Sequence, residues 1–219
     1  MNMSSFRRPG LLACSAATFL GACSSAPTHY HSLTPIHQAI DPSSPGTIVC
    51  TSGATSPTSS EPEPAGTVLL AHLAVPVEAD RMQLLLHQTP TRLSVYETER
   101  WAAPLRDQIS IILIDNLRNA LPNLNITGDP LLIGAGTPLQ LNMEIEELDA
   151  LAGKEATVRA QWRLSVNAVS QTATCTARQP LRSTGIDELV LAWSRALADI
   201  SSTLAASIQH RAGTNGAQK

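Results

Sequence analysis

Two histidines near the start of the chain are of a type and spacing that could bind a metal. His29 and His31 lie two residues apart in a short segment, residues 28–33, that is compatible with a β-strand. Because side chains two residues apart in a strand point to the same face, the two imidazoles could form half of a metal site. No matching cluster of Cys, His or Asp follows to complete a coordination shell. The alternative, an exposed strand edge, is therefore favoured, and we expect no metal and no other cofactor.

Patterns typical of catalysis are missing from the sequence. It contains no Gly-x-Ser-x-Gly nucleophile turn and no His-Glu-x-x-His zinc motif. An acidic run, made of Glu144, Glu146, Glu147 and Asp149, lies within a segment where apolar and polar residues alternate. That alternation places most of the acids on the solvated face of a strand. We therefore expect a protein without catalytic residues, and not an enzyme.

The cysteines carry the remaining chemistry. The chain opens with a basic region and an apolar region too short to span a bilayer, and then reads Leu-Gly-Ala-Cys up to Cys23. This ending resembles a bacterial lipobox, which implies that residues 1–22 are a signal peptide and that Cys23 is acylated, for example with palmitate. The alternative is an ordinary secretory signal cut after Ala22. Ser24 at the next position, rather than Asp, resembles lipoproteins that are sent to the outer membrane.

Removal of residues 1–22, which include Cys14, and acylation of Cys23 would leave two cysteines, Cys50 and Cys175, in an oxidising compartment. A disulfide between them would tie a Pro/Ser/Thr/Gly-rich segment, residues 41–66, to the end of a long hairpin. Two free thiols are the alternative, because the sequence does not show whether the two Cα atoms come within reach. The segment 41–66 has few aliphatic residues and is predicted to be a mobile loop, since it cannot bury enough surface to offset its ordering entropy.

The composition is that of one globular domain. The chain has 219 residues, of which 43% are hydrophobic and only 3% aromatic, so we expect a core of Leu, Ile, Val and Ala. Removing residues 1–22 takes away two arginines and no acid, which changes the net charge from −3 to −5. This charge and the shortage of aromatic residues give no support for binding nucleic acid.

Two long amphipathic helices are predicted. The first begins near Pro104 and ends before Pro122, because proline is tolerated in the first turn of a helix and stops it at the other end. Its apolar residues recur every four positions: Leu105, Ile109, Leu113, Leu117 and Leu121. The apolar residues of the second helix lie near the C-terminus: Leu189, Trp193, Leu197, Ile200, Leu204 and Ile208.

Strands are predicted before and between these helices. Residues 68–75 form a nearly continuous apolar run, and residues 82–86 and 93–96 are typical of a hairpin. Residues 139–146 and 156–168 alternate apolar and polar side chains with a period of two, which predicts two long strands joined by a turn.

Several of these residues also carry a resemblance to a known family. Behind the lipoprotein signal, the following features occur in this order: Asp80-Arg81, a strand pair, Arg100-Trp101-Ala102 with Pro104-Leu105, and Asn116-Leu117 with Leu121. This ordered set resembles the ABC-type transport auxiliary lipoprotein family, whose best-known member is PqiC. The resemblance implies an α/β fold, with a single domain in which a mixed β-sheet is flanked by the long amphipathic helices.

The resemblance also implies a function. Members of this family are non-catalytic auxiliary or docking components of MCE-type intermembrane lipid transport systems, which support membrane integrity. The expected partner is an MCE-domain, PqiB-like protein, and the expected place is the outer membrane, lipid-anchored and facing the periplasm, with a homo-oligomeric ring as one form of assembly. Candidate partner contacts are Asp80, Arg81 and Trp101. A local ion pair is the alternative for the first two, and a core position is the alternative for Trp101.

The second candidate function is a stand-alone periplasmic lipoprotein that binds a lipid or another hydrophobic molecule, which would need an internal apolar cavity. For the domain organisation, we predict a signal peptide at 1–22, an anchor linker at 23–27 and the auxiliary lipoprotein domain at 28–210. That domain would contain the low-complexity loop 41–66, and residues 211–219 would form a disordered tail.

Overall fold

The computed structural model describes residues 26–36, 46–53, 66–89, 91–151, 154–167 and 169–213. The predicted signal peptide and Cys23 lie outside the described residues. Within the described part of the chain, no helix has both the length and the apolar character needed to cross a membrane.

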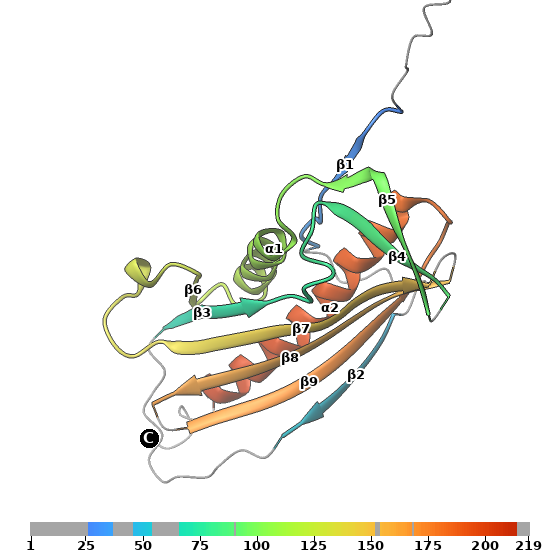
Figure 1. Ribbon diagram of the computed structural model, residues 1–219. Coiled ribbons are helices and arrows are strands. Elements are labelled where there is room, and N and C mark those ends of the chain that lie inside the picture. Colours follow the sequence, from blue (N-terminus) through green and yellow to red (C-terminus); the bar gives the residue numbers. More distant parts are fainter. Residues whose placement is uncertain are drawn as a thin grey trace, which may run out of the picture.

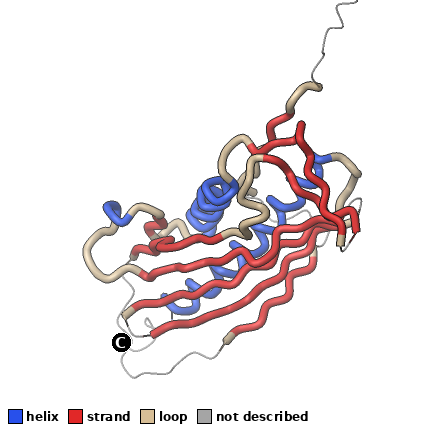
Figure 2. The backbone as a smooth tube through the Cα atoms, in the orientation of Figure 1, coloured by secondary structure: helices blue, strands red, loops and turns tan. Residues whose placement is uncertain are grey.

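Both long helices are confirmed. Helix α1 spans Leu105–Ala120 and begins directly after Pro104, and α2 spans Ile186–Gly213. The predicted apolar row of α1 faces the core. Each of its five residues is at most 3% exposed: Leu105, Ile109, Leu113, Leu117 and Leu121. The helices pack against each other and against the sheet, and both lie on the same side of it (Figures 1 and 2). This arrangement buries the apolar stripe of each helix and leaves the other sheet face open.

The described strands form one mixed sheet of nine, in the order β1-β5-β4-β7-β8-β9-β2, with β3 pairing both β6 and β7. The strands are β1 (His29–His31), β2 (Thr47–Ser52), β3 (Thr67–Ala74), β4 (Gln83–Thr89), β5 (Arg92–Trp101), β6 (Asn125–Thr127), β7 (Leu139–Leu151), β8 (Glu155–Val166) and β9 (Val169–Pro180). Pairs β1–β5, β3–β7 and β3–β6 are parallel, whereas β4–β5 and the β7-β8-β9-β2 series are antiparallel. The predicted single-domain α/β fold with a mixed sheet is thus confirmed.

The predicted period-two strands are also confirmed. The apolar residues of β8 from Ala156 to Val166 are buried against the helices, and those of β7 from Leu139 to Ile145 are buried with them. The polar residues between them face outward, where Arg159 pairs with Glu146 at 2.8 Å. Strand β9 was not predicted, because its inward positions are small or polar, such as Ala173, Cys175 and Gln179, and give no strong apolar signal.

The predicted loop at 41–66 is wrong for residues 47–52. These residues form β2, which pairs antiparallel with β9 and places Cys50 opposite Cys175, where the two cysteines form a disulfide. The side chains of β2 are mostly exposed, so backbone hydrogen bonds and the disulfide hold it rather than apolar burial. The predicted tail begins at residue 211, but helix α2 continues to Gly213. The buried Arg211 donates from Nη1 to the Leu164 carbonyl at 3.1 Å.

The sheet has one weak seam, between the β4–β5 hairpin and the rest. In the described part of the chain, β4 meets β7 through the single residue pair His87–Leu151, whereas β7 and β8 are paired along most of their length. The group β1-β5-β4 therefore leans away from the main sheet (Figure 1).

The buried row of α1 generates a first prediction. Leu117 is 1% exposed, whereas Ile111 on the same helix is 66% exposed. Leu117→Ala should reduce the free energy of unfolding by about 2–5 kcal/mol, because it removes buried methyl groups and leaves a cavity. Ile111→Ala, the matched control, should change it by less than about 0.5 kcal/mol. Urea denaturation of the two variants measures both values, and equal losses would contradict the packing described.

Candidate functional site

A hollow of about 260 Å³ lies at the seam, between the β4–β5 hairpin, strand β7 and the loop that follows β3. Its floor is apolar and is formed by the buried Trp101, Leu105 and Trp193, while Leu85 and Leu93 form an apolar wall on the side of the hairpin. Its rim is polar and acidic and is formed by Glu78, His87, Glu146, Glu147 and Asp149. The hollow is therefore an apolar pit with a ring of carboxylates around it.

Two tryptophans fix the floor of the hollow. Trp101, at the end of β5, and Trp193, on α2, have ring centroids 5.9 Å apart and a tilt of 40° between the rings. The Trp193 indole N–H donates to the Asp149 carbonyl of β7 at 2.9 Å. One side chain of α2 thus contacts both sides of the seam. Trp101, a candidate partner contact, is only 2% exposed, so it is a core residue that another molecule could reach only through the hollow.

The other two candidate contacts lie in the loop after β3, beside the hollow. The Asp80 carboxylate pairs with the Arg106 guanidinium of α1 at 3.0 Å, so among the described residues its ion pair is with α1 and not with its neighbour Arg81, as the alternative of a local pair would require. The cause is a tight turn in which the backbone N–H groups of Ala79 and Asp80 both donate to the Pro76 carbonyl. This turn brings Asp80 to the first turn of α1, while Arg81 remains exposed.

A β-bulge explains why the rim is so acidic. The register of β7 against β8 shifts between Ile145 and Glu147. Beyond the shift Leu148 lies opposite the core residue Val158, and Glu147 and Asp149 point to the outer face together with Glu146. Strict alternation would have turned Glu147 and Asp149 inward, and bulges are known to re-aim side chains in this way.

The charges of the rim are only partly balanced. Asp149 pairs with His87 at 2.6 Å, and Glu146 pairs with Arg159 at 2.8 Å. Glu78 and Glu147 have no ion pair with any residue that the structure describes. The rim is therefore net negative, and its two unpaired carboxylates lie on opposite walls, one on the loop after β3 and one on β7.

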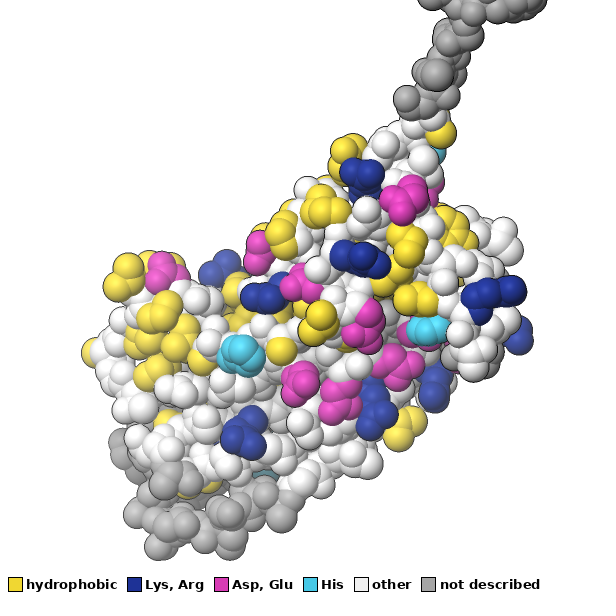
Figure 3. Space-filling model, viewed as in Figure 1, with side chains coloured by type: hydrophobic (Ala, Val, Ile, Leu, Met, Phe, Trp, Pro, Cys, Tyr) yellow, Lys and Arg dark blue, Asp and Glu magenta, His cyan; other side chains and the backbone are white. Residues whose placement is uncertain are grey.

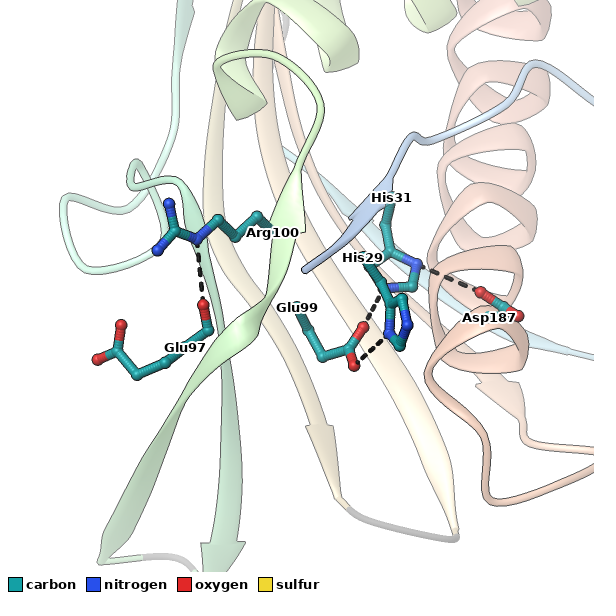
Figure 4. Close-up of polar contacts among 6 residues, drawn as sticks. All are labelled: His29, His31, Glu97, Glu99, Arg100 and Asp187. Carbon is teal, nitrogen blue, oxygen red and sulfur yellow. Dashed lines mark hydrogen bonds and ion pairs between the residues drawn. The ribbon is translucent and has the colours of Figure 1, made fainter. Parts of the chain in front are cut away.

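A second polar cluster lies where the N-terminal strand meets the fold (Figure 4). His29 Nδ1 and His31 Nε2 contact the two oxygens of Glu99 at 3.0 and 2.5 Å, and His31 Nδ1 lies 3.3 Å from an oxygen of Asp187. The prediction that both imidazoles point the same way is confirmed. The exposed-edge interpretation holds for His29, which is 60% exposed, but His31 is buried because β1 pairs with β5 and lies against α2.

This cluster consists of direct contacts between imidazoles and carboxylates. Among the residues described, no group of three or more His, Cys, Asp or Glu is arranged to hold a metal ion. The Glu99 carboxylate receives both imidazoles, and the Asp187 carboxylate lies beside the other ring nitrogen of His31. The hydrogen bond from His31, followed by that from His29, holds the pKa of Glu99 below its ordinary value. Sequence reasoning missed Glu99 because it lies 68 residues beyond His31, with no motif to link them.

A family model matches most of this chain. The family model described as "ABC-type transport auxiliary lipoprotein component" matches residues 51–205. The chain belongs to this family. Membership makes it an auxiliary lipoprotein of a transport system, and the description is that of a transport component, not of an enzyme. The matched range contains the hollow, both tryptophans and Glu99, whereas Cys23 lies before it.

Solved structures share the fold. A crystal structure of an uncharacterised protein has a TM-score of 0.66 at 16% identity, covering 84% of this chain and 99% of the other. Protein XCC0632 from Xanthomonas campestris has a TM-score of 0.55 at 19% identity, covering 74% and 94%. A PelC dodecamer from Paraburkholderia phytofirmans has 20% identity over 73% and 96%, but its TM-score of 0.40 is too low to extend its assembly to this chain. No curated protein matches the chain.

The polar cluster generates a prediction about pH. Because folding lowers the pKa of Glu99, its carboxylate contributes stability at a pH above the ordinary glutamate value, and this contribution is lost as the pH falls through the lowered value. Glu99→Gln should therefore reduce the free energy of unfolding more at a pH of about 6 than at about 3. Urea denaturation at the two pH values measures the difference.

The control for this prediction is Glu97→Gln, two residues earlier on the exposed part of the same strand. It should show little difference between the two pH values. A loss for Glu99→Gln that is the same at both would contradict the assignment of Glu99 as the carboxylate held by the two histidines.

Proposed function

We propose that this protein is an outer-membrane lipoprotein that acts as the non-catalytic docking component of an MCE-type intermembrane lipid transport system and so supports membrane integrity. The observation that carries the proposal is the family match over residues 51–205, which names an auxiliary part of a transport system. In this proposal Cys23 is acylated after removal of residues 1–22, and the folded domain faces the periplasm. Acyl chains contribute roughly 0.8 kcal/mol per buried CH₂, so a multiply acylated cysteine would hold the domain firmly on the membrane.

The arrangement of the N-terminal strand supports this role. The described chain enters the fold at β1, which is paired with β5 and held to α2 through His31 and Asp187. An anchor at Cys23 would thus be joined to the domain at a defined edge of the group β1-β5-β4. The same group forms one wall of the hollow. The membrane attachment and the surface offered to a partner would then lie on one structural unit.

The expected partner is a PqiB-like MCE protein, and the proposed mechanism is that of a scaffold. The acyl chains hold one end of the domain and its surface grips the tunnel protein, with identical copies arranged in a ring. Exposed residues of the loop after β3, Asp80 and Arg81 among them, lie beside the hollow and would contribute to this contact. Trp101 would contribute from the floor.

A stand-alone lipid carrier is the competing function, and the packing does not favour it. The hollow of about 260 Å³ lies below the roughly 300–1,000 Å³ of typical ligand pockets, and its rim is charged. Beneath it, the apolar faces of the helices and the sheet form one packed core. A carrier for acyl chains would need a larger apolar interior.

The proposal predicts a partner that copurifies. Affinity isolation of the lipidated protein from membranes in mild detergent, followed by mass spectrometry, should recover an MCE-domain protein in fixed proportion. Cys23→Ser, which cannot be acylated in the same way, should remove the protein from the outer-membrane fraction of a density gradient. Recovery of the lipoprotein alone with stoichiometric phospholipid would contradict the docking role and support the carrier.

A further inference from the structure

We infer that the hollow at the seam is a binding site for one large apolar side chain that is flanked in its own chain by Lys or Arg. That this side chain belongs to a segment of the transport partner rests on the function proposed above. The chemistry of the segment rests on the hollow itself.

The apolar part of the site has a floor and an exposed extension. Leu85 of β4 and Leu93 of β5 line the hollow, and Val95, which lies opposite Leu85, continues the same face of the hairpin. Leu93 is 43% exposed and Val95 is 44% exposed, so large apolar side chains remain in contact with water beside the hollow. Figure 3 shows hydrophobic side chains over this hairpin and the loop after β3, interspersed with basic and acidic ones. Such a patch beside a pocket is typical of a surface that binds another protein.

The charge of the rim selects the neighbours of the bound side chain. Glu78 and Glu147 lie on opposite walls and have no ion pair with a described residue, while Glu146 and Asp149 are already paired. Acidic side chains border the apolar patch along β7 in Figure 3. A segment with basic residues on both sides of its apolar residue could pair with both free carboxylates. A phosphate headgroup would instead be repelled by them.

The size of the hollow limits the occupant to a side chain. A volume of about 260 Å³ has room for one large apolar group, but not for a helix or for the chains of a lipid. Its floor is held by the contact between Trp101 and Trp193 and by the hydrogen bond of Trp193 to β7. Pockets with a fixed floor that accept a single anchor side chain are the usual centres of protein interfaces.

The two tryptophans of the floor provide the measurement. Short acetylated peptides with a Lys-Leu-Lys centre can be titrated into the purified domain, with the indole N–H signals of Trp101 and Trp193 followed by NMR. Both signals should shift with saturation, whereas Trp162, which is buried in the main sheet away from the hollow, should not move. Peptides with a Glu-Leu-Glu or Lys-Ser-Lys centre should bind about tenfold more weakly or not at all.

Charge reversal gives the matched test in the protein. The double variant Glu78→Lys/Glu147→Lys should lower the affinity for the Lys-Leu-Lys peptide by about tenfold. Glu144→Lys, which reverses an exposed acid of the same strand outside the hollow, should lower it by less than about twofold. Leu93→Ser, at the apolar wall, should weaken binding without changing its dependence on salt.

The inference is overturned by equal affinity for the Lys and Glu peptides, by unchanged signals of both floor indoles, or by equal losses for the double variant and Glu144→Lys. If a short-chain phosphatidylcholine shifts the signals of the floor indoles and the peptide does not, the ligand of the hollow is a lipid and not a protein segment. If the peptide binds as expected but no MCE protein copurifies, the binding site is supported and the proposed partner is contradicted. If an MCE protein copurifies equally well with the double variant and with the unaltered protein, the hollow is not the docking site.

Discussion

The contact of Trp193 with both sides of the seam is the interaction on which the rest of the site depends. Among the described residues, the hairpin β4–β5 is joined to β7 by one residue pair, so the backbone ladder alone gives little connection between the two parts of the sheet. Trp193, from α2, packs against Trp101 of β5 and donates its N–H to the Asp149 carbonyl of β7. The hollow lies at this contact, and Trp101 and Trp193 form part of its floor.

The N-terminal half of α2 connects the site to the point where the anchor would enter. Asp187, in its first turn, contacts His31 of β1, and Trp193, less than two turns further along, forms the floor of the hollow. Glu99 and Trp101 lie two residues apart on β5 and face these same two regions. The strand that follows the proposed lipid and the surface that would receive a partner therefore share their supporting residues.

Strong periodicity made much of the fold predictable. The four-residue row of α1 and the two-residue alternation of β7 and β8 each bury a continuous apolar face, and a sequence displays such a face directly. Strands β2 and β9 were not predicted, because mainly backbone pairing, small side chains and the Cys50–Cys175 disulfide hold them. The residues of the site were harder to predict from the sequence than the fold. The bulge that turns Glu147 outward and the contact of His31 with Glu99 depend on pairings between distant segments, which one sequence does not specify.

Amide hydrogen exchange of Trp193→Phe tests the central role of Trp193 most directly. This variant keeps an aromatic ring at the floor but loses the donor to Asp149, so amides of β4 and β5 should exchange about fivefold to tenfold faster while those of α1 and β8 stay protected. Trp162→Phe removes an indole N–H that has no hydrogen-bond partner among the described residues, and should not affect the hairpin selectively. Exchange that is unchanged in the hairpin, or faster throughout the domain, would contradict the account.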